Sequence, residues 1–203
     1  MSAKLCWLAR LGCLAGGLAL GAGAHAWEPD AAQMARLLAR GIVVVSDVDR
    51  SGAAGRARAA VWIAAPPATV FALMTDCARA LGYVPRMTAC KVLETGADRS
   101  WELIAHEVDY SWFLPRTRYV FRARYQAPAR VDFEAVSGDL EINQGSWQLT
   151  AAPDAAHTLV SYEVRLKPRM FVPAWLVRRG LRKDLPELLA ALRAVSEKPA
   201  PPP

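Results

Sequence analysis

The sequence predicts an α+β protein in which a strongly curved antiparallel sheet of about seven strands wraps around a long C-terminal helix. Two observations lead to this class. From position 91 to position 167, short β-rich segments alternate with turn residues, and such short connections join antiparallel neighbours. Residues 172–196 then carry apolar side chains at helical spacing, and the inner face of the sheet is the large surface that can bury them.

The first 26 residues have the layout of a secretory signal peptide. Lys4 and Arg10 precede an uncharged apolar run, and Ala24-His25-Ala26 supplies the small residues of a cleavage site. A membrane anchor is disfavoured because the run is short for a span of about 20 residues. A lipoprotein at Cys13 is disfavoured because Arg10 stands where an apolar residue is expected. We therefore expect export across the inner membrane, with the periplasm as the location.

The rest of the chain is expected to form one unit with short additions at both ends. Residues 27–54 should hold a helix capped by Asp30 and one extra strand, followed by the main domain at 55–196. Within that domain, the spacing of Val70, Phe71, Met74 and Cys77 predicts a helix. The Pro-rich tail at 197–203 should be disordered, since it cannot build a core.

The last helix and the strands before it show clear periodicity. On the segment 117–126 apolar and aromatic residues alternate with arginines, so one face of this strand should point inward. Pro186 should kink or restart the C-terminal helix, with Asp184 as the cap. The apolar stripe of this helix comprises Trp175, Leu181, Leu185, Leu188, Leu189, Leu192 and Val195.

Two cysteines, Cys77 and Cys90, remain after removal of the signal peptide. Exported proteins enter an oxidising space, so we predict a disulfide between them. A metal site formed with His106 is disfavoured because it lacks a clear fourth ligand. The sequence predicts no metal and no cofactor.

Signatures of catalysis are sparse. The sequence has no G-x-S-x-G motif, no phosphate-binding glycine loop and no dinucleotide fingerprint. His106 is the one catalytic candidate, because it shares strand parity with Ile104 and Val108 and should point inward. Two interpretations stay open: a core histidine bonded to a backbone carbonyl, or a ligand contact that can act as an acid–base partner of Glu102 or Asp109.

Several motifs resemble the START-like superfamily, also called SRPBCC. They are VWIAAPPATVF at 61–71, YVP at 83–85, GDL at 138–140, GSWQL at 145–149 and DLP at 184–186. The superfamily includes polyketide cyclase/dehydrase proteins, lipid-transport proteins and coenzyme Q-binding START-like proteins. The resemblance covers roughly residues 55–195 and implies the helix-grip fold.

The resemblance also implies a deep apolar cavity between the sheet and the C-terminal helix, with the YVP loop near its opening. Sequence alone leaves open whether this space is hollow or filled. The expected ligand-binding residues are Tyr83, Pro85, His106, Tyr119, Phe121, Phe133, Trp147, Tyr162, Trp175, Leu181 and Leu185.

The basic residues suggest a further partner. The formal net charge is +6, and it becomes +4 when the expected signal peptide takes Lys4 and Arg10 with it. Such a mild basic excess outside the cytoplasm argues against nucleic acid and is compatible with an anionic membrane or an acidic ligand. Arg178, Arg179, Arg182 and Lys183 follow Trp175 at the start of the last helix. They form either an ordinary solvated face or a surface that docks on anionic lipid. The oligomeric state stays open.

Three functions fit these features. The first is periplasmic binding or transport of a hydrophobic small molecule, such as a lipid, an isoprenoid quinone or a polyketide-like compound. The second is a cyclase- or dehydrase-type enzyme that acts on a hydrophobic substrate in the same cavity. The third is an interaction module with a closed cavity. The sparse polar residues and the expected export favour the first.

Overall fold

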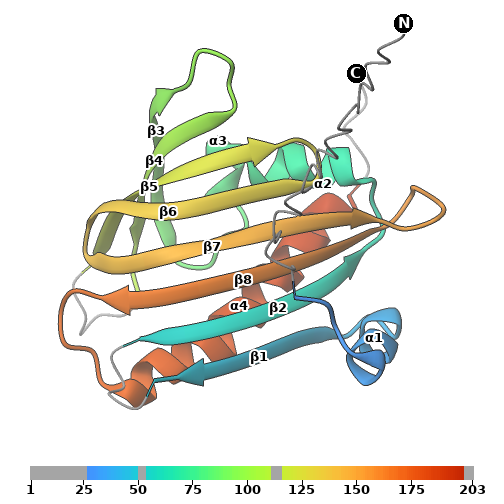
Figure 1. Ribbon diagram of the computed structural model, residues 1–203, viewed down its shortest axis with the longest axis horizontal. Helices are drawn as coiled ribbons and strands as arrows, with labels where there is room; N and C mark the ends of the chain where they lie inside the picture. The colour runs from blue at the N-terminus through green and yellow to red at the C-terminus, as the bar shows by residue number, and fades with distance from the viewer. Residues whose placement is uncertain (1–26, 50–53, 111–115, 199–203) are drawn as a thin grey trace, which may run out of the picture.

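One antiparallel sheet of eight strands carries the fold in the part of the chain that the computed structural model describes, residues 27–49, 54–110 and 116–198. The strand order is β1-β2-β8-β7-β6-β5-β4-β3, so the last strand joins the N-terminal hairpin to the others (Figure 1). The seven strands expected in the main domain are β2 to β8, and β1 is the extra strand. Their bounds are β1 Ile42–Val48, β2 Gly55–Ile63, β3 Met87–Thr95, β4 Trp101–Val108, β5 Thr117–Gln126, β6 Arg130–Gly138, β7 Leu140–Ala151 and β8 Thr158–Pro168.

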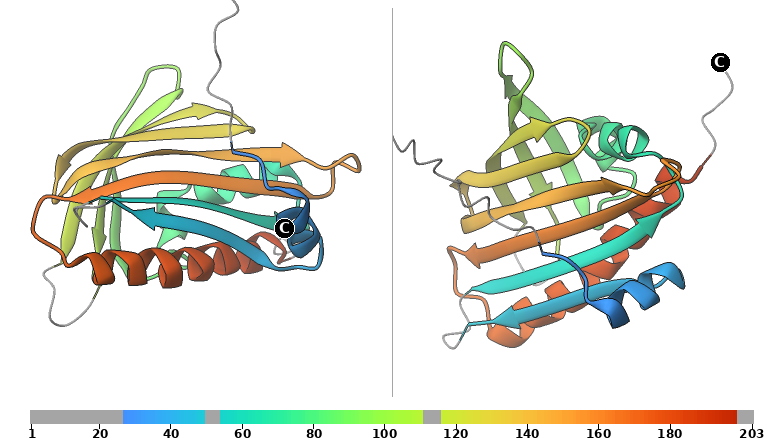
Figure 2. Two further views of the ribbon diagram at one scale, coloured as in Figure 1. Left: turned by 60° about the horizontal axis from the view of Figure 1, so that its bottom comes forward. Right: turned by 45° about the vertical axis from the view of Figure 1, so that its right-hand side comes forward.

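The C-terminal helix α4, Ala174–Ser196, lies along the concave side of this sheet (Figure 2). Side chains three or four positions apart are buried beneath the strands, as expected for one apolar stripe. They are Val177, Leu181, Leu185, Leu189, Leu192 and Ser196. The predicted class, a curved antiparallel sheet wrapped around a C-terminal helix, is therefore confirmed. No helix within the described ranges is long and apolar enough to cross a membrane.

Two details predicted for this helix are wrong. The helix does not restart at Pro186, which lies inside it, and Asp184 does not cap a new helix but pairs with Arg86 at 2.5 Å. Trp175 lies outside the buried stripe, with 61% of its surface exposed. It stands six residues before Leu181, or about 240° around the helix, whereas Val177 occupies the aligned position four residues before it.

The helix predicted after the proline pair is in fact two helices, α2 at Pro67–Met74 and α3 at Cys77–Ala80. Asp76 separates the two helices: its carboxylate accepts hydrogen bonds from the backbone N–H groups of Ala78 and Arg79 at 2.9 and 3.3 Å. This N-cap starts a new helix. Cys77 is consequently the first residue of α3, and not a late residue of a longer helix.

The N-terminal helix α1, Ala31–Leu38, begins at Asp30 as expected, with Gln33 completing a capping box. At the other end of the chain, Glu197 belongs to the ordered fold. Its carboxylate accepts hydrogen bonds from Arg40 at 2.9 and 2.7 Å and from the Ala64 N–H at 2.8 Å. The prediction of a disordered tail is therefore wrong for Glu197. Residues 199–203 and the expected signal peptide lie outside the described residues.

Candidate functional site

Two adjoining cavities lie between the sheet and α4. We call the smaller one, of about 190 Å³, the inner chamber, and the larger one, of about 440 Å³, the outer chamber. The second volume lies in the range of about 300–1,000 Å³ that is usual for small-molecule sites. The chambers adjoin because five residues line both: Val84, Tyr119, Asn143, Tyr162 and Leu188.

Aromatic side chains from the inner face of the sheet form the wall of the inner chamber. The ring centroids of Trp147 and Tyr162 are 4.0 Å apart, those of Phe133 and Tyr162 6.0 Å, and those of Phe121 and Phe133 6.4 Å. These rings come from neighbouring strands on which side chains alternate between the two faces. Among the described residues, no Asp, Glu, Lys or Arg lines this chamber.

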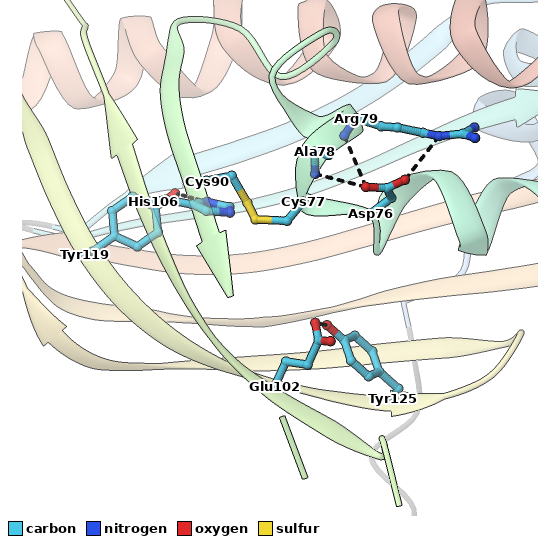
Figure 3. Close-up of a disulfide and its surroundings, with 9 residues drawn as sticks. All are labelled: Asp76, Cys77, Ala78, Arg79, Cys90, Glu102, His106, Tyr119 and Tyr125. Atoms are coloured by element: carbon cyan, nitrogen blue, oxygen red, sulfur yellow. Dashed lines mark hydrogen bonds and ion pairs between the residues drawn. A yellow bond between two sulfur atoms is a disulfide. The ribbon is translucent and has the colours of Figure 1, made fainter. Parts of the chain in front are cut away.

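His106 lies in the inner chamber, as its strand parity predicts. Its Nδ1 is 3.2 Å from the Tyr119 hydroxyl, and its ring is 4.7 Å from that of Phe121 (Figure 3). Burial lowers the pKa of His106 to about 4, so the imidazole is neutral near pH 7. Burial also raises the pKa of Tyr119 and Tyr162, so both phenols keep their protons.

The carboxylates suggested as acid–base partners of His106 are engaged elsewhere. Glu102 accepts a hydrogen bond from the Tyr125 hydroxyl at 2.8 Å, away from the histidine in Figure 3. Asp109 pairs with Arg116 at 3.4 Å. Neither acid pairs with the imidazole: Glu102 shares the face of His106 on β4 but stands four residues, or about 13 Å, away along the strand, and Asp109 follows the end of β4.

The predicted disulfide is confirmed: Cys77 and Cys90 are bonded, with their Cα atoms 5.5 Å apart (Figure 3). Because the sulfurs are joined to each other, they are not available for the alternative metal site. Both cysteines line the inner chamber, and Cys90 is the cross-strand neighbour of His106. The bridge thus ties α3 to β3 at the wall of the cavity.

Of the described residues that line the two chambers, those with charged side chains all belong to the outer one. Arg86, in the loop before β3, reaches across to Asp184 on α4, and Arg179 and Lys183 line the same chamber. The backbone of Arg86 is left-handed, with φ of 59°, a conformation that few non-glycine residues adopt. The ion pair connects the loop that the disulfide closes to the C-terminal helix.

The chambers account for all but one of the expected ligand-binding residues. Pro85, Leu181 and Leu185 line the outer chamber. Trp175 lines neither chamber and is a correction to the expected site. It lies beside the basic residues Arg178, Arg179, Arg182 and Lys183, which are exposed as expected, around a shallow surface hollow. The inner chamber is lined by Tyr83, His106, Tyr119, Phe121, Phe133, Trp147 and Tyr162.

Two residues of the site went unnoticed in the sequence. Asn143 is 8% exposed, and its side-chain amide has no hydrogen-bond partner among the described residues. The sequence does contain a sign of this residue: Asn143 is at an alternate position to Trp147 and Leu149, so a polar side chain lies on the inward face of β7. Gly180 lines the outer chamber, and a Cβ placed on it would meet only Asp184 Oδ2, at 3.6 Å. The sign of Gly180 in the sequence is its place in the middle of a helix. Glycine there destabilises the helix by about 1 kcal/mol relative to alanine, so its presence suggests another role.

The buried, neutral state of His106 predicts a loss of stability in acid. Its pKa falls from an ordinary 6.5 to about 4 in the folded chain, so between these values the unfolded chain binds the extra proton. Stability is therefore lost as pH falls from 6.5 toward 4. Relative to pH 7, the loss at about pH 4.5 should amount to about 2 kcal/mol.

Denaturant unfolding of wild type and His106→Gln at both pH values measures this contribution. The variant should lose about 2 kcal/mol less than wild type on acidification. His157→Gln, which removes the other histidine of the described chain, controls for the loss of a histidine as such. Equal losses in wild type and His106→Gln would show that the imidazole is not held neutral by burial.

A curved antiparallel sheet that grips a C-terminal helix over an internal cavity defines the helix-grip fold. Within that class, the chain belongs to the polyketide cyclase/dehydrase and lipid transport family, whose sequence profile matches residues 63–193. No curated protein sequence matches the chain.

Solved structures share the fold at low sequence identity. The STAR-related lipid transfer protein of Xanthomonas axonopodis is 19% identical, with a TM-score of 0.65 over 77% of this chain and 94% of that one. The Zhui aromatase/cyclase of a Streptomyces species is 14% identical, with a TM-score of 0.59 over 77% and 94%. A START superfamily protein of Mycobacterium smegmatis is 17% identical, with a TM-score of 0.60 over 76% and 97%.

Proposed function

We propose that the protein binds and carries a hydrophobic small molecule, such as a lipid, an isoprenoid quinone or a polyketide-like compound. The observation that carries this proposal is the pair of adjoining chambers, the inner one aromatic and uncharged and the outer one large enough for an apolar chain. The family description, which includes lipid transport, and the similarity to a lipid transfer protein support it.

The proposed location is the periplasm. The N-terminal 26 residues have the charge and hydrophobicity pattern of a signal peptide. The bond between Cys77 and Cys90 supports the same location, because disulfides persist in oxidising compartments and are rare in the cytosol. A carrier placed there would move its cargo to or from a membrane surface.

A peripheral contact with anionic lipid is part of this proposal. We call the exposed Phe171, Trp175, Arg178, Arg179, Arg182 and Lys183 the basic-aromatic surface. Phe171, three residues before α4, is 89% exposed, and Trp175, which borders the hollow with the four cationic side chains, is 61% exposed. Arg179 and Lys183 also line the outer chamber, so this surface lies at the cavity rim. Aromatic rings next to basic groups suit the headgroup region of an anionic membrane.

Extraction of bound molecules tests the proposed cargo. The full chain is exported, purified from the periplasm, extracted with organic solvent and examined by mass spectrometry. Wild type and Gly180→Ala should release an apolar molecule in stoichiometric amount. Gly180→Phe should release far less, because its ring fills the outer chamber. Both variants should fold, since they replace a mid-helix glycine whose Cβ position is open.

Two outcomes would contradict the proposal. One is wild-type protein that is repeatedly empty and also binds no added apolar dye. The other is equal extraction from all three proteins, which would mean that the molecules adhere outside the cavity.

One observation favours a cyclase- or dehydrase-type enzyme as the second candidate. The neutral imidazole of His106 faces the chamber beside the Tyr119 hydroxyl, and a neutral imidazole can take a proton from a substrate. A poly-β-ketone offered to the wild type and to His106→Gln distinguishes the candidates. Turnover that disappears in the variant, with its melting temperature unchanged, would establish the enzyme; its absence in both leaves the carrier.

A further inference from the structure

We infer that Asn143 selects the cargo: the ligand buries an uncharged ring that carries a hydroxyl or carbonyl oxygen, and that oxygen is hydrogen-bonded by the Asn143 amide. This inference rests on the proposed function, since it concerns the cargo of the same cavity. It follows from the position of Asn143, from the size of the inner chamber and from the absence of charge there.

Asn143 stands where the two chambers meet, on the inward face of β7. Only 8% of its surface is exposed, and its amide has no hydrogen-bond partner among the described residues. The hydroxyl of Tyr162, which lines both chambers as well, likewise has no partner in this part of the chain. If an apolar ligand covers this amide without a hydrogen bond, the binding free energy becomes less favourable by about 1–3 kcal/mol. A ligand oxygen that accepts a hydrogen bond from the amide replaces the bond to water and avoids this penalty.

The inner chamber has the size and the walls for a ring. Its volume is about 190 Å³, and an apolar protein cavity of about 150 Å³ is large enough to hold benzene. The stacked rings of Trp147 and Tyr162 offer flat surfaces against which another ring can pack. A single ring with one or two small oxygen substituents fits this space, and its apolar chain would extend into the outer chamber.

The absence of charge in the inner chamber disfavours an ionised group on the ring that the ligand buries there. Within the described residues, the inner chamber has no Lys or Arg, and burial keeps His106 neutral. A carboxylate or phosphate placed there would lose its hydration without a counter-charge, which is far more costly than burying a hydroxyl. The cations Arg86, Arg179 and Lys183 line the outer chamber and not the inner one.

Three probes with the same chain test the inference: para-hexylphenol, hexylbenzene and para-hexylbenzoate. Their dissociation constants are measured by calorimetry on the purified, solvent-stripped full chain. Wild type should bind the phenol about tenfold more tightly than the hydrocarbon, since one hydrogen bond is gained. The benzoate should bind no more tightly than the hydrocarbon.

Asn143→Leu, which has nearly the same size, should remove the preference by weakening the phenol about tenfold while the hydrocarbon binds as before or better. Asn143→Ala repeats the test if the melting temperature shows that leucine disturbs the packing. Gln144→Leu, at the exposed neighbouring position on the other face of β7, is the matched control and should keep the wild-type preference.

A preference that survives in Asn143→Leu, or wild type that binds phenol and hydrocarbon equally, would overturn the inference and leave the carrier function standing. Tight binding of the benzoate that Asn143→Leu weakens would also overturn it, because an ionised group would then occupy the position. If wild type binds none of the probes, the proposed function fails together with the inference.

Discussion

Replacement of Cys77 and Cys90 together by alanine should lower the free energy of unfolding by about 3 kcal/mol. The bridge joins residues 13 positions apart, and the entropy that it removes from the unfolded chain sets this magnitude. The measurement is denaturant unfolding of the wild type and of Cys77→Ala/Cys90→Ala under non-reducing conditions.

The same variant should also weaken ligand binding, because the bridge closes the segment that supplies Tyr83, Val84 and Pro85 to the chamber walls. Reductant serves as the control: it should destabilise the wild type to the level of the variant and leave the variant unchanged. The prediction of a stabilising disulfide fails if both cysteines of the exported protein are alkylated without reductant. It also fails if reduction does not change the stability of the wild type.

Reversal of two charges on the basic-aromatic surface should weaken binding to anionic vesicles by at least about 30-fold, since each basic residue near such a surface contributes about 1 kcal/mol. The variant is Arg178→Glu/Arg182→Glu. These two arginines border the surface hollow and do not line the outer chamber, so the cavity should be unchanged. Sedimentation with phosphatidylcholine vesicles that contain about one third phosphatidylglycerol measures the binding.

The matched control is Arg56→Glu/Arg165→Glu, which changes the net charge equally on the outer face of the sheet. Arg56 and Arg165 are exposed cross-strand neighbours on β2 and β8. This control should keep most of its vesicle binding, because those arginines lie on the face that α4 does not cover. Equal losses in the two double variants would mean that net charge alone drives the association and that the protein has no dedicated docking surface.

Periodicity was sufficient to place residues on the faces of strands. Alternation in 117–126 put Tyr119 and Phe121 on the inward face, and the structure places both in the inner chamber. The parity of His106 predicted its inward direction for the same reason. Strands alternate strictly between two faces, so a buried face can be identified without knowledge of its neighbours.

Periodicity failed where a local hydrogen bond or a position on a helix decided the outcome. Asp76 starts a new helix at Cys77 although apolar spacing continues across it. Trp175 is apolar and lies on α4, yet the direction of the buried stripe leaves it in solvent. Glu197 stands in a polar, proline-rich tail, but Arg40 and the Ala64 N–H, more than 130 residues away in sequence, hold it in the fold.

The sequence by itself determined the class of the fold and the order of its strands, because both follow from patterns between near neighbours. It also paired Cys77 with Cys90, because these two cysteines remain after the expected signal peptide is removed and export favours oxidation. The tertiary structure decided that the space under the sheet is hollow, that Asn143 has no side-chain partner among the described residues where two chambers meet, and that Glu102 and Asp109 pair with Tyr125 and Arg116. The reason is physical. A cavity is the volume that side chains from many strands fail to fill, and that volume depends on how their sizes and directions combine in space.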